Sequence, residues 1–108
     1  MTKIFYKDAD AVILIYDITR RGNFEQIKEY WFKHVKEINT KVNCAFAIVG
    51  HKSDEFEREE VSEKESKEYA EKVGAFWFSA SVKEGTGIEE IFKGIANKFL
   101  NQTTALKL

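Results

Sequence analysis

Ala-Val-Ile-Leu-Ile-Tyr-Asp, residues 11–17, is the stretch that decides the fold class of this chain. It is a continuous apolar run, rich in β-branched residues and ended by Asp17, and this pattern is typical of a strand covered on both faces. Such strands occur mainly in parallel sheets. Two further apolar runs, at residues 44–49 and 76–80, repeat the pattern. We therefore predict a parallel sheet of about three strands.

Three amphipathic helical patterns alternate with these runs, over residues 24–38, 62–73 and 88–99. Apolar residues recur there at intervals of three and four, which is the spacing of one helix face. The first stripe consists of Phe24, Ile27, Trp31, Val35 and Ile38, and the last of Ile88, Ile91, Phe92, Ile95 and Phe99. The expected capping residues are Asn23 with Gln26, Ser62 with Glu65, and Gly74. The order βαβαβα favours right-handed crossovers and an α/β fold in which helices are layered on the sheet.

The length of 108 residues allows one domain, because a single core is usually built from roughly 100 to 200 residues. Hydrophobic residues make up 44% of the chain and charged residues 32%, which is enough for a core and unlike a disordered segment. We predict the domain over residues 1–100, with a short helical lead-in at residues 1–8, and a frayed tail over residues 101–108.

Charge and cysteine content exclude several classes of function. The formal net charge is −1, so no basic excess is available to neutralise a phosphate backbone, and nucleic acid is not an expected partner. One cysteine, Cys44, excludes an intrachain disulfide and a cysteine metal cage. Neither histidine lies at metal-ligand spacing from an acid, so no metal site is predicted. Without a secretory signal or an apolar run of roughly 20 residues, a cytoplasmic location is expected.

Polar residues follow each predicted strand. Asp17 and Thr19 follow the first strand, residues 51–54 the second, and residues 81–83 the third. Ligands collect outside the carboxyl ends of the strands in open α/β sheets, so these loops form the candidate site. The residues alone leave another interpretation open, in which the second loop is solvated charge and the third is a plain turn.

Three segments together suggest a family: Phe-Tyr-Lys-Asp-Ala-Asp-Ala-Val-Ile-Leu-Ile-Tyr-Asp-Ile-Thr (residues 5–19), Ile-Val-Gly-His-Lys-Ser-Asp (48–54) and Ser-Val-Lys-Glu-Gly-Thr-Gly-Ile-Glu-Glu-Ile-Phe (81–92). The chain resembles the C-terminal half of a small GTPase of the Ras superfamily, within the Rab branch. In that family an Asn-Lys-x-Asp loop and a Ser-Ala-Lys loop bind the guanine base of GTP or GDP. The resemblance assigns guanine binding to His51, Lys52, Asp54, Ser81, Val82 and Lys83. His51 replaces the family's Asn, and Val82 replaces its Ala.

The chemistry of Asp54 suits this role. A carboxylate accepts hydrogen bonds from both guanine N1–H and the exocyclic amino group, as a charge-assisted pair. Adenine has an acceptor where guanine has N1–H, and a mismatch that leaves buried polar groups unpaired costs about 1 to 3 kcal/mol per group. The stem of Lys52 would lie on the base plane, and the backbone N–H of Val82 would meet the guanine carbonyl.

The sequence contains no Gly-x-x-x-x-Gly-Lys-Ser/Thr phosphate loop, and the segments that hold magnesium in the family are absent too. Phosphoryl transfer depends almost entirely on positioning and charge stabilisation, so we expect no catalytic residue and no GTP hydrolysis by this chain alone. Gly85 and Gly87 are expected to form a turn. The last residues hold no cysteine for a lipid anchor.

By the same resemblance, the family's first strand would pair beside residues 11–16. We therefore expect an exposed apolar strand edge, which could pair with a protein partner. The expected function is that of a Rab-like chain in vesicle traffic that keeps the guanine-recognition half. Three alternatives stay open: a non-catalytic protein-interaction module, a truncated GTPase fragment without nucleotide binding, and a phosphate-accepting receiver that uses Asp17 and Lys83. The receiver lacks an early acidic pair for magnesium.

Overall fold

The computed structural model describes residues 9–39, 44–96 and 103–107. Its strands are β1 (Ala11–Asp17), β2 (Ala45–His51), β3 (Phe76–Ala80) and β4 (Thr103–Lys107). They form one sheet in the order β3-β2-β1-β4, and all three neighbouring pairs are parallel. The predicted α/β fold with three parallel strands is confirmed, and a fourth strand joins it.

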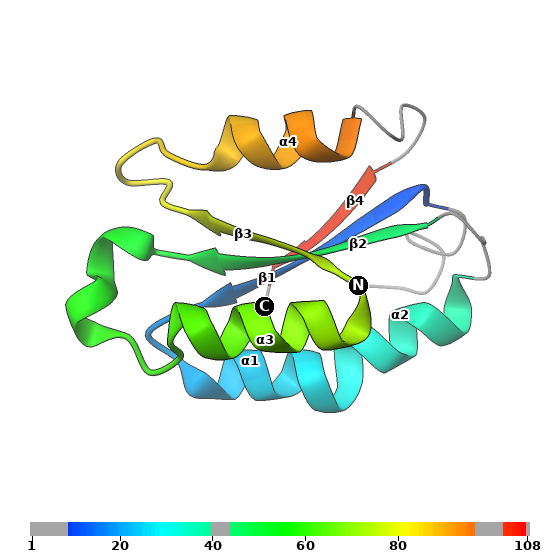
Figure 1. The fold of residues 1–108 in the computed structure, drawn as a ribbon, viewed down its shortest axis with the longest axis horizontal. Helices are drawn as coiled ribbons and strands as arrows, with labels where there is room; N and C mark the ends of the chain where they lie inside the picture. Colours follow the sequence, from blue (N-terminus) through cyan, green and yellow to red (C-terminus); the bar gives the residue numbers. More distant parts are fainter. Residues whose placement is uncertain (1–8, 40–43, 97–102, 108) are drawn as a thin grey trace.

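The helical segments are α1 (Arg21–Gln26), the π turn η2 (Ile27–Trp31), α2 (Phe32–Ile38), the 3₁₀ segment η3 (Ser53–Arg58), α3 (Glu63–Val73) and α4 (Ile88–Ala96). Helices α1, α2 and α3 cover one face of the sheet and α4 lies on the other (Figure 1). This follows from right-handed crossovers. The chain steps from β1 to β3 toward one edge, then returns across the sheet to β4, so the last helix changes face.

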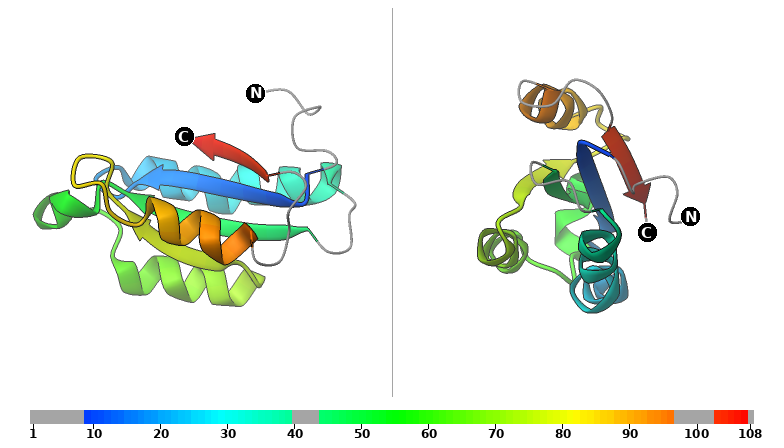
Figure 2. Two further views of the ribbon diagram at one scale, coloured as in Figure 1. Left: turned by 90° about the horizontal axis from the view of Figure 1, so that it is seen from above. Right: turned by 90° about the vertical axis from the view of Figure 1, so that its right-hand side faces the viewer.

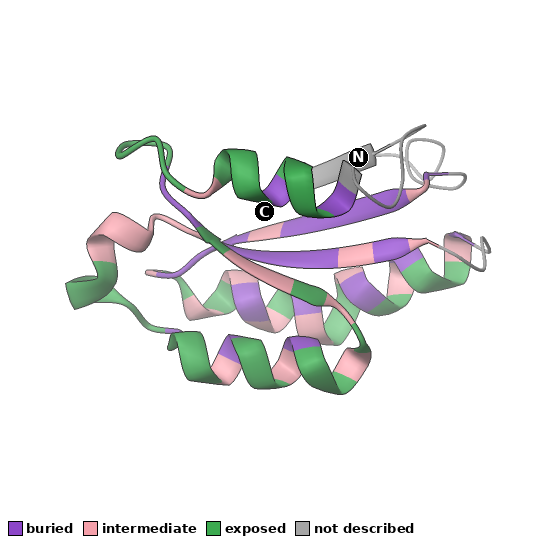
Figure 3. Cartoon of the chain, turned by 45° about the horizontal axis from the view of Figure 1, so that its top comes forward, coloured by how far each residue is buried: buried purple, intermediate pink, exposed green. Residues whose placement is uncertain are grey.

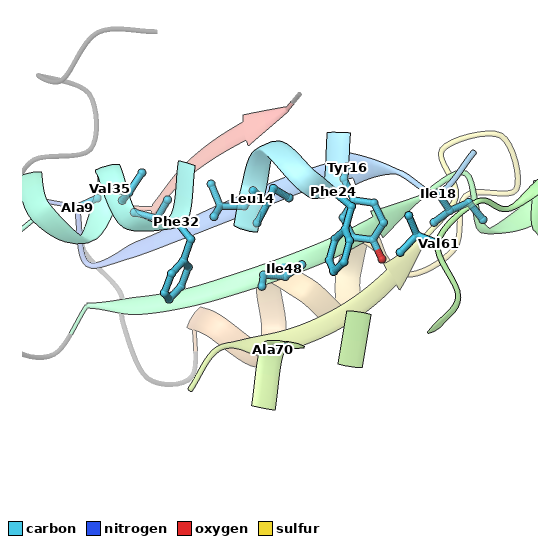
Figure 4. Packing of buried hydrophobic residues seen from close by; sticks show 12 residues of the cluster. Ala9, Leu14, Tyr16, Ile18, Phe24, Phe32, Val35, Ile48, Val61 and Ala70 are labelled. Carbon is cyan, nitrogen blue, oxygen red and sulfur yellow. The ribbon is translucent and has the colours of Figure 1, made fainter. Parts of the chain in front are cut away.

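The core lies on both faces of β1, as the apolar run predicts. Val12, Leu14 and Tyr16 pack against the helices α1 and α2, whereas Ala11 and Ile13 belong to a cluster with α4. Burial follows the two central strands, and the helices are buried only along their inner stripes (Figure 3). On the α1 side, the rings of Tyr16 and Phe24 lie side by side with centroids 5.1 Å apart (Figure 4). Full burial of a side chain of this size contributes roughly 1.5 to 3 kcal/mol.

The first predicted helix is continuous from α1 to α2 but contains the π turn. Its fully buried residues on the early turns are Phe24 and Ile27, and the next buried side chain is Phe32 rather than Trp31. A step of five residues is the repeat of π-helical hydrogen bonding, so η2 places Ile27 and Phe32 on one face. Trp31 is only partly buried against the same cluster.

The helix caps are partly as predicted. Ser62 Oγ accepts a hydrogen bond from Glu65 N at 3.1 Å, and Gly74 ends α3 in a left-handed conformation with φ 75°. The prediction for Asn23 is wrong, because α1 already begins at Arg21. Asn23 Oδ1 instead accepts a long hydrogen bond, 3.4 Å, from the backbone N–H of Asp17.

The expectation of a frayed tail is corrected by β4, which pairs with β1 in a parallel register that sets Ala105 opposite Ile13. The edge of β1 is therefore covered, and the expected exposed edge is not found there. Figure 2 shows β4 on the side of β1 away from β3. A strand edge presents unpaired N–H and C=O groups that any extended segment satisfies, so a short polar stretch with little strand pattern still pairs there. Residues 1–8 and Phe99 lie outside the described residues.

Helix α4 buries less than its sequence stripe predicts. Ile91 and Ile95 are buried, whereas Ile88 and Phe92 are 39% and 52% exposed. The described part of the chain places only α4 on this face of the sheet, so one helix shields a limited width of it. Among the described helices, none has the length and apolar character needed to span a membrane.

Candidate functional site

The carboxyl ends of β1, β2 and β3 meet at one end of the sheet. Asp17 is opposite His51 in the register of β1 and β2, and His51 is opposite Ala80 in that of β2 and β3. The loops that follow these three strands are therefore neighbours. Among the sequence-predicted site residues, Asp54 and Ser81 are brought into hydrogen-bond contact there, although they lie 27 positions apart in the chain.

Ser81 links the second and third loops. Its hydroxyl donates to Asp54 Oδ1 at 2.5 Å and accepts a hydrogen bond from Glu84 N at 3.1 Å. Ser81 is fully buried. The hydrogen bond from Ser81 is the largest of the influences that hold the pKa of Asp54 below its ordinary value, and the positive charge of Lys83 acts in the same direction. Asp54 is thus an ionised carboxylate with one oxygen fixed by the protein.

Lys52 has an unusual backbone for a residue with a Cβ, with φ 68° and ψ 38° in the left-handed region. This conformation costs roughly 1 to 2 kcal/mol relative to the right-handed one. Its side chain reaches back over the end of the sheet, where Nζ lies 2.8 Å from Asp17 Oδ2. The other oxygen of Asp17 accepts from Thr19, from N at 2.9 Å and from Oγ1 at 2.6 Å.

The Asp17 side chain is 9% exposed, so its pKa depends on the groups that surround it. Burial acts to raise its pKa, but the hydrogen bonds from Lys52 and Thr19 outweigh burial and lower the pKa to about 2. Sequence reasoning marked Asp17 as a strand-end residue and missed its pairing with Lys52. The available signal was a carboxylate directly after a buried strand, because a buried charge needs a partner.

The third loop is a tight turn between Ser81 and Thr86, which exchange backbone hydrogen bonds of 2.9 and 3.0 Å. Gly85 and Gly87 both have positive φ, 68° and 84°, so the prediction of a glycine turn is confirmed. Val82 is 65% exposed at the start of this turn.

Val82 and His51 also reach a cavity of about 190 Å³ on the α4 side of the sheet. The rest of its lining is apolar: Ile13, Ile15, Val49, Ala80, Ile88, Ile91 and Phe92. The polar group formed by Asp54 and Ser81 does not line this cavity. The Asp54–Ser81 pair and the apolar cavity are therefore two separate features of these loops. In the part of the chain that the structure describes, no three His, Cys, Asp or Glu side chains gather as metal ligands.

The chain is similar to a known protein family and to curated proteins. The family model described as "Ras family" matches residues 1–101. The rat Ras-related protein Rab-31 is 37% identical over 98 residues, which cover 91% of this chain and 49% of that protein. The human Ras-related protein Rab-21 is 36% identical over 97 residues, 90% of this chain and 42% of its own. The Arabidopsis thaliana Ras-related protein RABC1 is 30% identical over 100 residues, 93% and 47%. The chain spans about half the length of the curated relatives it matches.

Proposed function

The chain belongs to the Ras family of small GTPases, and we propose that it binds the guanine base of GDP or GTP through the loops after β2 and β3. In this proposal Asp54 accepts hydrogen bonds from guanine N1–H and the exocyclic amino group. The stem of Lys52 lies on the base, and the backbone N–H of Val82 meets the guanine carbonyl. Ser81 holds Asp54, while His51 and Lys83 flank the base site.

The observation that carries the proposal is the Ser81 hydroxyl between Asp54 and the backbone of Glu84. It fixes one carboxylate oxygen and keeps the group ionised, because a hydrogen bond to the charged form favours that form. The second oxygen then supports charge-assisted hydrogen bonds, which are about twice as strong as neutral ones. A fixed, ionised carboxylate selects guanine over adenine, since adenine offers no N–H at that position.

Base recognition is the part of the family's activity that we assign to the residues present here. The sequence contains no Gly-x-x-x-x-Gly-Lys-Ser/Thr segment, so no group in it is assigned to the phosphates or to magnesium, and no catalytic residue is proposed. By similarity to the Rab relatives, we propose vesicle traffic as the cellular process. Phosphate binding and hydrolysis are not part of this proposal.

Isothermal titration of the purified chain with GDP and with ADP tests the proposal. We expect saturable binding of GDP and none of ADP at the same concentrations. Asp54→Ala removes a charge-assisted acceptor, and should weaken GDP binding roughly 10- to 100-fold. Glu57→Ala is the matched control, because Glu57 is an exposed acid of the same loop, and it should leave the affinity unchanged. Equal affinities for GDP and ADP, or an Asp54→Ala variant as tight as the parent chain, would refute base recognition.

A protein-interaction role is the second candidate, favoured by one observation. Val82, Ile88 and Phe92 are exposed apolar side chains beside the 190 Å³ cavity. Large exposed apolar groups that lie together are typical of a surface that binds another protein. Binding of a hydrophobic dye by the folded chain, lost in Phe92→Ser, would support this role. An unchanged dye signal in Phe92→Ser would count against it.

A further inference from the structure

Lys52 holds a backbone conformation that its own chemistry disfavours. In the described parts of the chain, every other residue with positive φ is a glycine. A residue with a Cβ stays in the left-handed region only when the surrounding structure holds it there. At the start of η3 the side chain of Lys52 makes no capping bond, while its backbone carbonyl accepts a hydrogen bond from Glu55 N at 2.8 Å.

The side chain of Lys52 adds a second contact, its ion pair with Asp17. Lys52 Nζ lies 2.8 Å from Asp17 Oδ2, and the Asp17 side chain is only 9% exposed. Asp17 itself is rigidly placed, because it is the last residue of β1 and Thr19 donates two hydrogen bonds to its other oxygen. The second cation near Asp17 is Arg20, whose Nε is 3.8 Å away and whose side chain is 73% exposed. Lys52 is therefore the closer of the two cations.

We propose that Asp17 is a positioning residue which, acting through Lys52, holds the base-recognition loop in its left-handed conformation before a nucleotide arrives. The inference rests on the proposed function, since it says how that loop is prepared. Asp17 does not touch the nucleotide in this proposal. It raises the fraction of molecules in which Lys52 and Asp54 are already placed, and the apparent dissociation constant falls in proportion to that fraction.

The effect on affinity follows from the left-handed backbone. Without the ion pair, the side chain of Lys52 no longer opposes a return to conformations that are favoured over the left-handed one by a factor of roughly 5 to 30. Asp17→Asn is the direct variant, because the amide oxygen still accepts from Thr19 while the charge is lost. We expect it to raise the dissociation constant for GDP roughly 5- to 30-fold. Arg20→Gln is the matched control and should change the constant less than 2-fold.

A double-mutant cycle separates positioning from general damage. Lys52→Met keeps an apolar stem for the base but removes the ammonium group. If Asp17 acts through Lys52, the double variant Asp17→Asn with Lys52→Met binds GDP as weakly as Lys52→Met alone. If the two effects multiply instead, Asp17 acts independently of Lys52 and the inference is overturned.

The order of the free loop gives a second readout that does not depend on nucleotide binding. We expect the ¹⁵N heteronuclear NOE of Lys52 and Ser53 to be high in the parent chain and in Arg20→Gln, and low in both Asp17→Asn and Lys52→Met. Loops that are equally ordered in all four proteins would overturn the inference, whatever the GDP titration gives. If the parent chain binds no GDP while Asp17→Asn loosens the loop, the proposed function fails and the role of Asp17 in holding Lys52 stands.

Discussion

Gly87→Ala should destabilise the fold by far more than the same change at Gly85. Both glycines have positive φ, so each substitution costs roughly 1 to 2 kcal/mol in backbone conformation. At Gly87 the new Cβ would lie 2.1 Å from the carbonyl oxygen of Ser79 and 2.8 Å from Ala80 Cα, whereas at Gly85 nothing lies within 4 Å. Relief of that overlap requires a backbone shift, and overpacking of this kind costs a further ~1 to 3 kcal/mol. We expect a total loss of about 2 to 5 kcal/mol at Gly87.

Urea unfolding followed by far-UV circular dichroism measures the difference, because the midpoint falls with the free energy of unfolding when the slope is unchanged. The expected order of midpoints is parent chain, then Gly85→Ala, then Gly87→Ala. Gly87→Asn is a further control: asparagine tolerates positive φ but carries the same Cβ, so its midpoint should stay near that of Gly87→Ala. Equal midpoints for Gly85→Ala and Gly87→Ala would refute the reasoning. A Gly87→Ala chain that does not fold, beside a folded Gly85→Ala, agrees with it.

Three further results are expected. Folding lowers the pKa of Asp17 from 3.8 to about 2, so the ionised carboxylate contributes about 2 kcal/mol to the free energy of unfolding above pH 4. This contribution is lost as the pH falls through 2, so the free energies of unfolding of the parent chain and Asp17→Asn should converge between pH 4 and pH 2. A difference that stays constant over this range would contradict the expectation. Removal of residues 103–108 uncovers the edge of β1, so the shortened chain should associate in a concentration-dependent way. Size-exclusion chromatography with light scattering measures this, and a monomer at all concentrations would show that β4 does not protect the edge. Trp77→Phe removes the 2.8 Å hydrogen bond from Nε1 to the buried Ser66 Oγ and should lower the free energy of unfolding by about 1 to 3 kcal/mol. Thermal unfolding checks this, and an unchanged melting temperature would contradict it.

The central strands were predictable because their signal is local. A strand covered on both faces must be apolar along its length, and residues 11–16 meet that condition without reference to any other part of the chain. The same holds for Gly74, whose left-handed conformation at the end of α3 follows from the need for a residue without a Cβ. The π turn was not predictable, because the choice of Phe32 over Trp31 as the buried residue depends on the space beneath the helix.

The membership of the candidate site was partly predictable. Asp54 and Ser81 were expected to be neighbours because the carboxyl ends of parallel strands meet, and the structure places them in hydrogen-bond contact. The role of Asp17 toward Lys52 was not visible. It depends on the left-handed backbone of Lys52 and on the register of β1 against β2, and neither is a property of a short stretch of sequence.

Sequence alone determined the α/β class, the three apolar strands and the two loops of the candidate site, because periodicity and chain order specify which segments are buried and in what succession. Only the tertiary structure shows that residues 103–107 form a strand, which pairs with β1 and covers its edge. It also decided the partner of Lys52. Backbone pairing at an edge and ion pairing at a strand end are both contacts between segments far apart in the chain. Their energies depend on the distance between the two segments, which is set only when the sheet has formed.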